Sequence, residues 1–194
     1  YNSTHTYQVR ARNAEGFSEW SEELSTASLQ DPWRNVPTPT SVSWNGGDTW
    51  GAIENGFDHD LNTMFHSSDN TALGQPMVID YGQAYQLDKF VYTPRQDNGG
   101  NGNVVSLKVE TSLDGVNWVV QQESSEWKTG NNADGLASKT VELTGFARYV
   151  RLTALSSSGG FFSAGELALY KVDGTSGFEV GSLPSAPYTV GTED

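Results

Sequence analysis

The stretch Phe57–His66, which reads F-D-H-D-L-N-T-M-F-H, decides how the rest of the chain is interpreted. Oxygen-bearing side chains alternate with other residues in it, at Asp58, Asp60 and Asn62, and Thr63 follows. Hard cations such as Ca²⁺ take about 6–8 oxygen ligands from carboxylates, amides and backbone carbonyls. The spacing therefore suits a calcium loop. It also suits a surface turn, because Asp and Asn side chains hydrogen-bond their own backbone.

An EF-hand begins with the same D-x-D-x-N spacing. That loop then needs a Gly at its sixth position and a Glu at its twelfth. Here those positions hold Thr63 and Asp69, and no amphipathic helix flanks the run. The sequence therefore excludes an EF-hand.

Two further features accompany this stretch. It ends on an aromatic residue and a histidine, Phe65-His66, and a late run, Phe161–Leu167, reads F-F-S-A-G-E-L. Together these runs resemble the family-32 carbohydrate-binding modules, relatives of the discoidin and coagulation-factor C-type domains. Members of that family carry A-x-D-G-D-x-N-T-x-W-H early and F-x-S-A-x-E-h late. His59 stands in place of the usual Gly and Phe65 in place of the usual Trp.

The resemblance covers residues 40–172, and its separated motifs come in the right order. It implies a jelly-roll β-sandwich with a structural Ca²⁺, which ties the early loop to the late run at the far end of the module. The ligands that we expect from this resemblance are the Gly56 carbonyl oxygen, Asp58, Asp60, Thr63 and Glu166.

A second motif, residues 92–103, reads Y-T-P-R-Q-D-N-G-G-N-G-N and forms a glycine-rich loop after a strand. It lacks the Gly-Lys-Ser or Gly-Lys-Thr of a phosphate-binding loop. Family-32 modules use a Y-x-P-R-Q-D-x-x-x-N-G loop to supply an Arg and an Asn to galactose-type sugars. Arg95 and Asn101 match that pattern, with Asn98 as a rival because the glycine spacing varies. The other interpretation is a surface turn with an exposed Arg95.

Three ring side chains complete the expected sugar site. His66 is either a structural histidine or the family's sugar-contacting one, since a neutral imidazole accepts at one nitrogen and donates at the other. Phe161 matches the family's stacking Phe, with Phe162 as the alternate, and one of the two belongs to the core. Trp50 either lines the sugar site or packs against other side chains of the domain without a role in binding. Sugar C–H faces stack on such rings through burial and dispersion.

Composition sets limits on the function. The 194 residues are 36 % hydrophobic and 11 % aromatic, contain no cysteine and carry a formal net charge of −13. A disulfide framework and thiol chemistry are therefore excluded. Nucleic acids and anionic membranes attract the opposite sign of charge. No run reaches the roughly 18 apolar residues of a membrane helix.

Residues 40–172 read as short strands without a convincing helix. Period-two alternation is clear in 105–111, and a Leu-Asp-Gly turn at 113–115 predicts a hairpin. The remaining predicted strands are 76–82, 87–93, 140–143, 148–154 and 166–172. Many short strands separated by turns indicate an all-β sandwich or jelly roll.

The flanks differ from this region. Residues 1–29 resemble the last two strands of a fibronectin type III domain, and residues 30–39 form a proline-rich linker. The sandwich is expected over 40–173. Residues 174–194 form a second linker and resemble the start of a following fibronectin type III domain, so we expect the chain to be a piece of a longer protein.

Catalysis is not expected. Glycoside hydrolysis requires two carboxylates at a defined separation, and the chain has no G-x-S-x-G or HExxH motif. The resemblance implies a monomeric, non-catalytic module that binds terminal galactose or N-acetylgalactosamine. We expect it in a secreted or cell-surface, multi-domain bacterial enzyme that degrades glycans. The alternative is a discoidin-type adhesion module for a protein or membrane surface.

Overall fold

The computed structural model divides the chain into two compact units, residues 1–34 and 35–194, and each is described by itself. The described residues are 4–27, 31–47, 49–68 and 70–181. The predicted start of a following domain therefore lies mostly outside them.

The first unit is a long antiparallel hairpin. Its strands are β1 (Thr4–Tyr7) paired with β4 (Leu24–Ala27), and β2 (Arg12–Asn13) paired with β3 (Gly16–Phe17). The Arg10 guanidinium lies 3.9 Å from the centroid of the Phe17 ring and 4.5 Å from that of Trp20. Residues 4–25 are all exposed, so the hairpin has no core of its own. Its assignment to a fibronectin type III domain stays a prediction.

The second unit holds the predicted sandwich. Its elements in chain order are β5 (Ser41–Trp44), β6 (Thr49–Gly51), η1 (Ile53–Gly56), β7 (Phe65–Ser67), η2 (Asn70–Ala72), β8 (Pro76–Thr93), β9 (Val104–Ser112), β10 (Val119–Gln122), α1 (Ala133–Leu136), β11 (Lys139–Glu142), β12 (Phe146–Ser157), η3 (Ser158–Gly160), β13 (Ser163–Ala164) and β14 (Glu166–Lys171). None of the helices among the described residues is long and apolar enough to cross a bilayer.

Strand β8 connects the two layers of the sandwich. Its first part lies between β12 and β5, and its last part lies between β11 and β14. The prediction of two separate strands at 76–82 and 87–93 is therefore wrong. Gly82 lets one strand continue through the bend, because its φ of 75° suits glycine. The Gly82 amide also donates to Asp80 Oδ1 at 2.7 Å.

The core fills the space between these layers. Apolar residues alternate along β12, so that Val150, Leu152 and Ala154 are fully buried while Arg151 and Thr153 are not. Phe90 on β8 packs in the same cluster, from the other layer. The predicted all-β sandwich is confirmed, since side chains from both layers share one continuous core.

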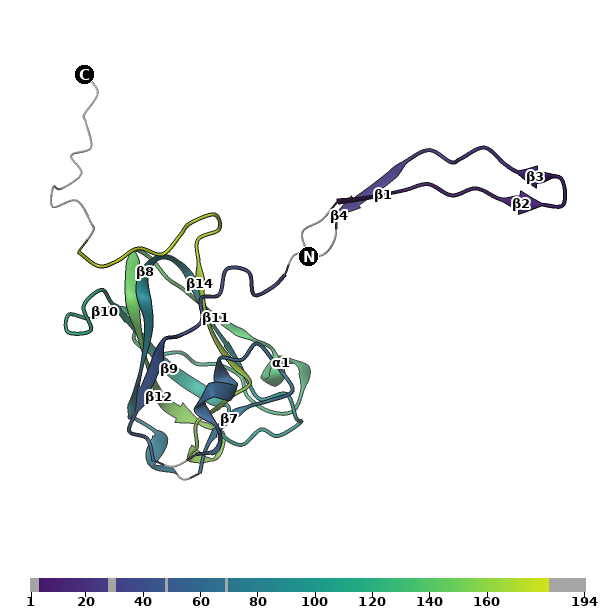
Figure 1. Ribbon diagram of the computed structural model, residues 1–194. Helices are drawn as coiled ribbons and strands as arrows, with labels where there is room; N and C mark the ends of the chain where they lie inside the picture. Colours follow the sequence, from purple (N-terminus) through teal and green to yellow (C-terminus); the bar gives the residue numbers. More distant parts are fainter. Residues whose placement is uncertain (1–3, 28–30, 48, 69, 182–194) are drawn as a thin grey trace, which may run out of the picture. The chain divides into compact units, whose positions relative to one another are not determined.

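A small sheet, ordered β13-β7-β6, lies beside this core. In Figure 1, β7 lies at the end of the second unit away from the loop that follows β14. Successive residues of a strand point to opposite faces. Phe65 accordingly enters the core, with its ring centroid 5.2 Å from that of Trp44 and 5.1 Å from that of Phe162. The next residue, His66, faces the other side.

Candidate functional site

His66 lies between two aromatic rings on that outer side. Its ring centroid is 4.5 Å from the Trp50 ring and 5.5 Å from the Phe161 ring. Trp50 is 57 % exposed, Phe161 is half-buried and His66 is only 1 % exposed. The structure thus brings together three of the residues that the sequence predicts for the sugar site. Phe162 is fully buried and belongs to the core, so Phe161 is the one of these two phenylalanines that can meet a ligand.

Backbone contact fixes the protonation pattern of His66. Its Nδ1 lies 2.5 Å from the Ser67 carbonyl oxygen, which only accepts, so Nδ1 carries the proton. Burial lowers the pKa of the His66 imidazole below its usual value, and the charge of Arg95 lowers it further against the opposing Ser67 hydrogen bond. Nε2 is buried and makes no hydrogen bond among the described residues, although the Asn101 carbonyl lies near enough to the ring to oppose the lowering of its pKa. It is therefore an acceptor at neutral pH.

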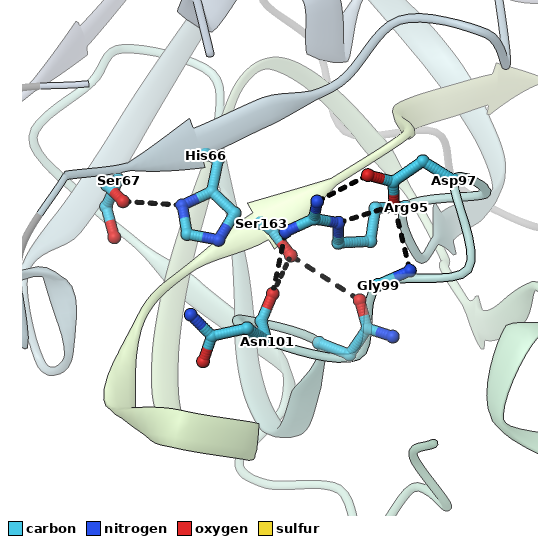
Figure 2. Close-up of polar contacts among 8 residues, drawn as sticks. His66, Ser67, Arg95, Asp97, Gly99, Asn101 and Ser163 are labelled. Atoms are coloured by element: carbon cyan, nitrogen blue, oxygen red, sulfur yellow. Dashed lines mark hydrogen bonds and ion pairs between the residues drawn. The ribbon is translucent and has the colours of Figure 1, made fainter. Parts of the chain in front are cut away.

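Arg95 follows the end of β8, and Figure 2 shows it between His66 and Asp97. Its Nε donates to Asp97 Oδ1 at 2.7 Å and its Nη2 to Asp97 Oδ2 at 2.5 Å. Arg95 is only 8 % exposed, so the alternative of an exposed surface arginine is wrong. The guanidinium holds the pKa of Asp97 down at about 2. Asp97 thus keeps the buried charge paired and orients it.

Asn101 contacts Arg95 through its backbone. Its backbone carbonyl accepts from Arg95 Nη1 at 3.4 Å and from Ser163 Oγ at 3.2 Å. Arg95 has five N–H groups, and these contacts occupy three of them, so one on Nη1 and one on Nη2 remain for a ligand. Asn101 is itself exposed, as is its rival Asn98, which adopts a φ of 63°.

Two polar residues of this region escaped the sequence reasoning. Asp97 orients Arg95, and the only signal was a carboxylate two residues after the arginine. Asn103 is fully buried, its Oδ1 accepts from Ser163 Oγ at 3.4 Å, and its Nδ2 has no partner among the described residues. No pattern in the sequence distinguishes Asn103 from the other asparagines of its loop.

The stretch Phe57–His66, called the acidic loop below, lies close to Glu166. Glu166 stands at the start of β14. The His59 amide donates to Glu166 Oε2 at 3.0 Å, with His59 at a φ of 62°. Glu166 is 1 % exposed and its Oε1 has no partner among the described residues. Burial raises the pKa of Glu166 to about 8, and the nearby charge of Asp58 adds to this rise against the His59 hydrogen bond.

The contacts inside the loop fit both interpretations of its spacing. Asp58 Oδ1 accepts from the Asp60 amide and Asp60 Oδ1 from the Asn62 amide, each at 2.9 Å, which are the contacts of consecutive Asx turns. Thr63 Oγ1 donates to Asp58 Oδ2 at 2.7 Å, and Gly56 is buried beside the loop. In the described part of the chain, no three His, Cys, Asp or Glu side chains are grouped closely enough to hold a metal by themselves.

Comparison with known proteins shows that the chain belongs to a known family. The F5/8 type C domain family matches residues 39–167. The structure is similar to the module CBM32-1 of a family 31 glycoside hydrolase from Clostridium perfringens. That module is 30 % identical at a TM-score of 0.62, and the match covers 73 % of this chain and all of that one.

Two further relatives from Clostridium perfringens were solved with sugars. CBM32-5 of CpGH89, in complex with GalNAc-β-1,3-galactose, is 28 % identical at a TM-score of 0.58, over 67 % of this chain and 94 % of that one. The family 32 module of NanJ, in complex with galactose, is 26 % identical at a TM-score of 0.57, over 68 % and 93 %.

A longer relative is an enzyme, the A type blood N-acetyl-α-D-galactosamine deacetylase of Flavonifractor plautii. It is 28 % identical over an alignment of 193 residues, and the match covers 96 % of this chain and 23 % of that protein. The chain thus spans about a quarter of that curated relative.

Proposed function

We propose that this chain is a non-catalytic module that binds terminal galactose or N-acetylgalactosamine. The observation that carries the proposal is the group formed by His66, Arg95, Trp50 and Phe161. His66 Nε2 offers an acceptor, and the outward N–H groups of Arg95 offer charged donors. Sugar hydroxyls both donate and accept, so they match this pair. The rings of Trp50 and Phe161 supply apolar surface for the C–H face of the sugar.

Arg95 provides the test of this function. Arg95→Ala removes charge-assisted hydrogen bonds of roughly 1.5–3 kcal/mol, a tenfold to hundredfold loss of affinity. Titration calorimetry with galactose, N-acetylgalactosamine and their methyl glycosides measures this loss of affinity. Arg95→Lys should also weaken binding, because lysine keeps the charge but lacks the planar fork. Arg12→Ala, on the hairpin of the first unit, is the matched control and should leave affinity unchanged.

Two results would count against this function. Absence of heat with all of these sugars would remove the proposal altogether. Unchanged affinity in a folded Arg95→Ala protein would place the binding site elsewhere on the domain.

We further propose a structural Ca²⁺ between the acidic loop and Glu166. The carboxyl of Glu166 is buried, one of its oxygens has no partner within the described ranges, and a cation there would stabilise its ionised form. The residues that would hold the ion are the Gly56 carbonyl oxygen, Asp58, Asp60, Thr63 and Glu166. The ion would join the loop to β14 and supply no chemistry of its own to the sugar site.

The parent protein, in this proposal, is a secreted or cell-surface bacterial enzyme that acts on glycans. The relative from Flavonifractor plautii supports this setting, since it aligns with almost the whole of this chain. The module would keep such an enzyme at its substrate. Binding to an anionic membrane instead is opposed by the net charge of −13.

A further inference from the structure

A pocket of about 270 Å³ lies beside the candidate sugar site. Residues 61–64 of the acidic loop form one wall, and the residues after Arg95 form the other. Its lining consists of Leu61, Asn62, Thr63, Met64, Gln96 and Asp97. Ligand pockets usually span about 300–1,000 Å³; this one lies just below that range, so it can take no more than a single sugar ring.

Both walls of the pocket continue into the sugar site. Asp97 lines the pocket with the same carboxylate that holds Arg95 at 2.7 and 2.5 Å. Met64, which lines the pocket, directly precedes β7, the strand that carries His66. Figure 2 shows Asp97 on the side of Arg95 away from His66. A ring bound at His66 and Arg95 therefore has the pocket next to it, beyond the Arg95–Asp97 pair.

The polar groups of the pocket are mainly acceptors. Gln96 Nε2 donates to the carbonyls of Pro94 at 2.7 Å and Leu136 at 3.0 Å, so the side chain offers its Oε1. Asn62 Nδ2 donates to Asp60 Oδ1 at 2.7 Å, which leaves Oδ1 and a single N–H. Both oxygens of Asp97 already accept from Arg95, so the free acceptors of Gln96 and Asn62 are the groups that favour ligand donors such as hydroxyls or amide N–H groups. The net charge of −13 on the chain disfavours anionic groups.

Leu61 and Met64 add an apolar surface to this polar lining. Leu61 is 40 % exposed, so its apolar side chain is available to a ligand in a loop of otherwise mainly polar residues. Sugars combine hydroxyl groups with apolar C–H faces, and such a face gains from burial against side chains of this kind. The combination of acceptors with a small apolar wall therefore matches an uncharged sugar ring.

We infer that this pocket is a second subsite, which binds the uncharged sugar linked to the terminal galactose-type residue. The inference rests on the proposed function, because the first sugar must occupy the site at His66 and Arg95. The first site accordingly recognises the terminal sugar. The pocket selects among its possible neighbours and excludes uronic acids.

The test compares ligands that share the first sugar. Calorimetry on the intact chain uses methyl galactoside and a panel of uncharged disaccharides, which includes galactosyl-glucose isomers and GalNAc-β-1,3-galactose. At least one uncharged disaccharide should bind roughly three- to tenfold more tightly than the methyl glycoside, as one or two added hydrogen bonds would give. Replacement of its second sugar by the matching uronic acid should remove that gain.

A blocking variant assigns the gain to the pocket. Leu61→Trp fills the space, so the disaccharide should bind only as well as methyl galactoside, whose own affinity stays unchanged. Leu155→Trp is the matched control at 43 % exposure and should change neither affinity.

The outcomes separate the two proposals. If every disaccharide binds like the methyl glycoside, or if folded Leu61→Trp keeps the gain, the subsite is wrong and the first site stands. If the parent chain binds none of the sugars, the proposed function itself fails. The comparison of neutral with uronic disaccharides needs no variant, so it decides the matter even if Leu61→Trp does not fold.

Discussion

One hydrogen bond of His66 determines what this residue can offer a ligand. The Ser67 carbonyl fixes the proton on Nδ1, and the buried Nε2 is left as an acceptor. Protonation would convert Nε2 into a donor and place a second positive charge next to Arg95. The lowered pKa of His66 thus protects the acceptor function at neutral pH.

This arrangement predicts the pH dependence of sugar binding. The pKa of His66 lies below its usual value of 6.5, so the affinity should be constant between pH 6.5 and 8. It should fall on acidification, as the imidazole gains its proton. Because the unfolded chain binds that proton more readily, the contribution of His66 to the free energy of unfolding should fall below pH 6.5, whereas the Glu166 carboxyl, with its pKa raised to about 8, contributes in the opposite direction. Calorimetry across this range checks the affinity; tighter binding in acid would contradict this role for His66.

The neighbours Phe161 and Phe162 make a matched pair for mutation. Phe161→Ala removes a half-exposed ring beside His66, so galactose affinity should fall several-fold while stability hardly changes. Phe162→Ala removes a fully buried ring, which should lower the free energy of unfolding by about 3–5 kcal/mol. Calorimetry and urea unfolding on both variants separate the two effects. The reverse assignment would hold if Phe162→Ala lost binding without losing stability.

At the scale of elements, the long strand β8 determines the shape of the sandwich. One strand pairs with β5 and β12 in its first part and with β11 and β14 in its last part. The bend at Gly82 makes this possible. A Cβ at Gly82 would lie 2.5 Å from Thr40 Oγ1, so the bend also requires the absence of a side chain.

A comparison of Gly82, at this bend, with Gly145, just before β12, separates backbone strain from side-chain crowding. Gly82→Ala and Gly145→Ala both force a residue with a side chain into positive φ, at 75° and 80°. Each should lose about 1–2 kcal/mol of stability for that reason. A Cβ at Gly145 meets nothing within 4 Å, whereas Gly82→Ala must also displace Thr40 and should lose roughly 1 kcal/mol more. Urea unfolding measures the difference; equal losses would show that Thr40 adapts freely.

The period-two patterns predicted the fold class well, because each buried strand shows its alternation locally. They could not predict that residues 76–93 form one strand, because a glycine inside a strand sequence reads as a turn signal. The structure instead uses the positive φ of Gly82 within the strand. For the site, the motifs identified His66, Arg95 and Phe161, which meet in space although His66 lies on β7 and the other two lie outside the strands. The contact of Asp97 with Arg95, and the choice between Phe161 and Phe162, depend on side-chain directions that a loop sequence does not encode.

At the scale of the whole molecule, negative charge is concentrated enough to matter for stability. The chain has a formal net charge of −13, and Glu166 buries a carboxyl group near the charge of Asp58. Burial of an ionised carboxylate is unfavourable unless it is paired. A bound cation would relieve that cost at the point where the loop meets β14.

Removal of calcium should therefore destabilise the domain. A ligand that binds only the folded state adds about 2.7 kcal/mol at one hundred times its Kd, which corresponds to roughly 5–10 °C in Tm for a domain of this size. Differential scanning calorimetry with calcium and with a chelator measures the shift. Glu166→Gln lacks the charge and should show little response, whereas exposed Glu54→Gln should behave as the parent. A chelator-insensitive Tm in the parent chain would remove the basis of the calcium proposal.

The segments that lead into β5 and out of β14 lie near the middle of β8. The Lys171 amide donates to the Asn35 carbonyl at 2.9 Å, and Ser41 and Lys171 pair with Asp80 and Leu87 of β8. The sugar site begins after Thr93, roughly 20 Å from Leu87 at about 3.3 Å per residue. Tension applied through Asn35 and Lys171 would therefore run across the middle of β8. The binding loops would carry none of that load, so the domain could hold a sugar while its tether is pulled.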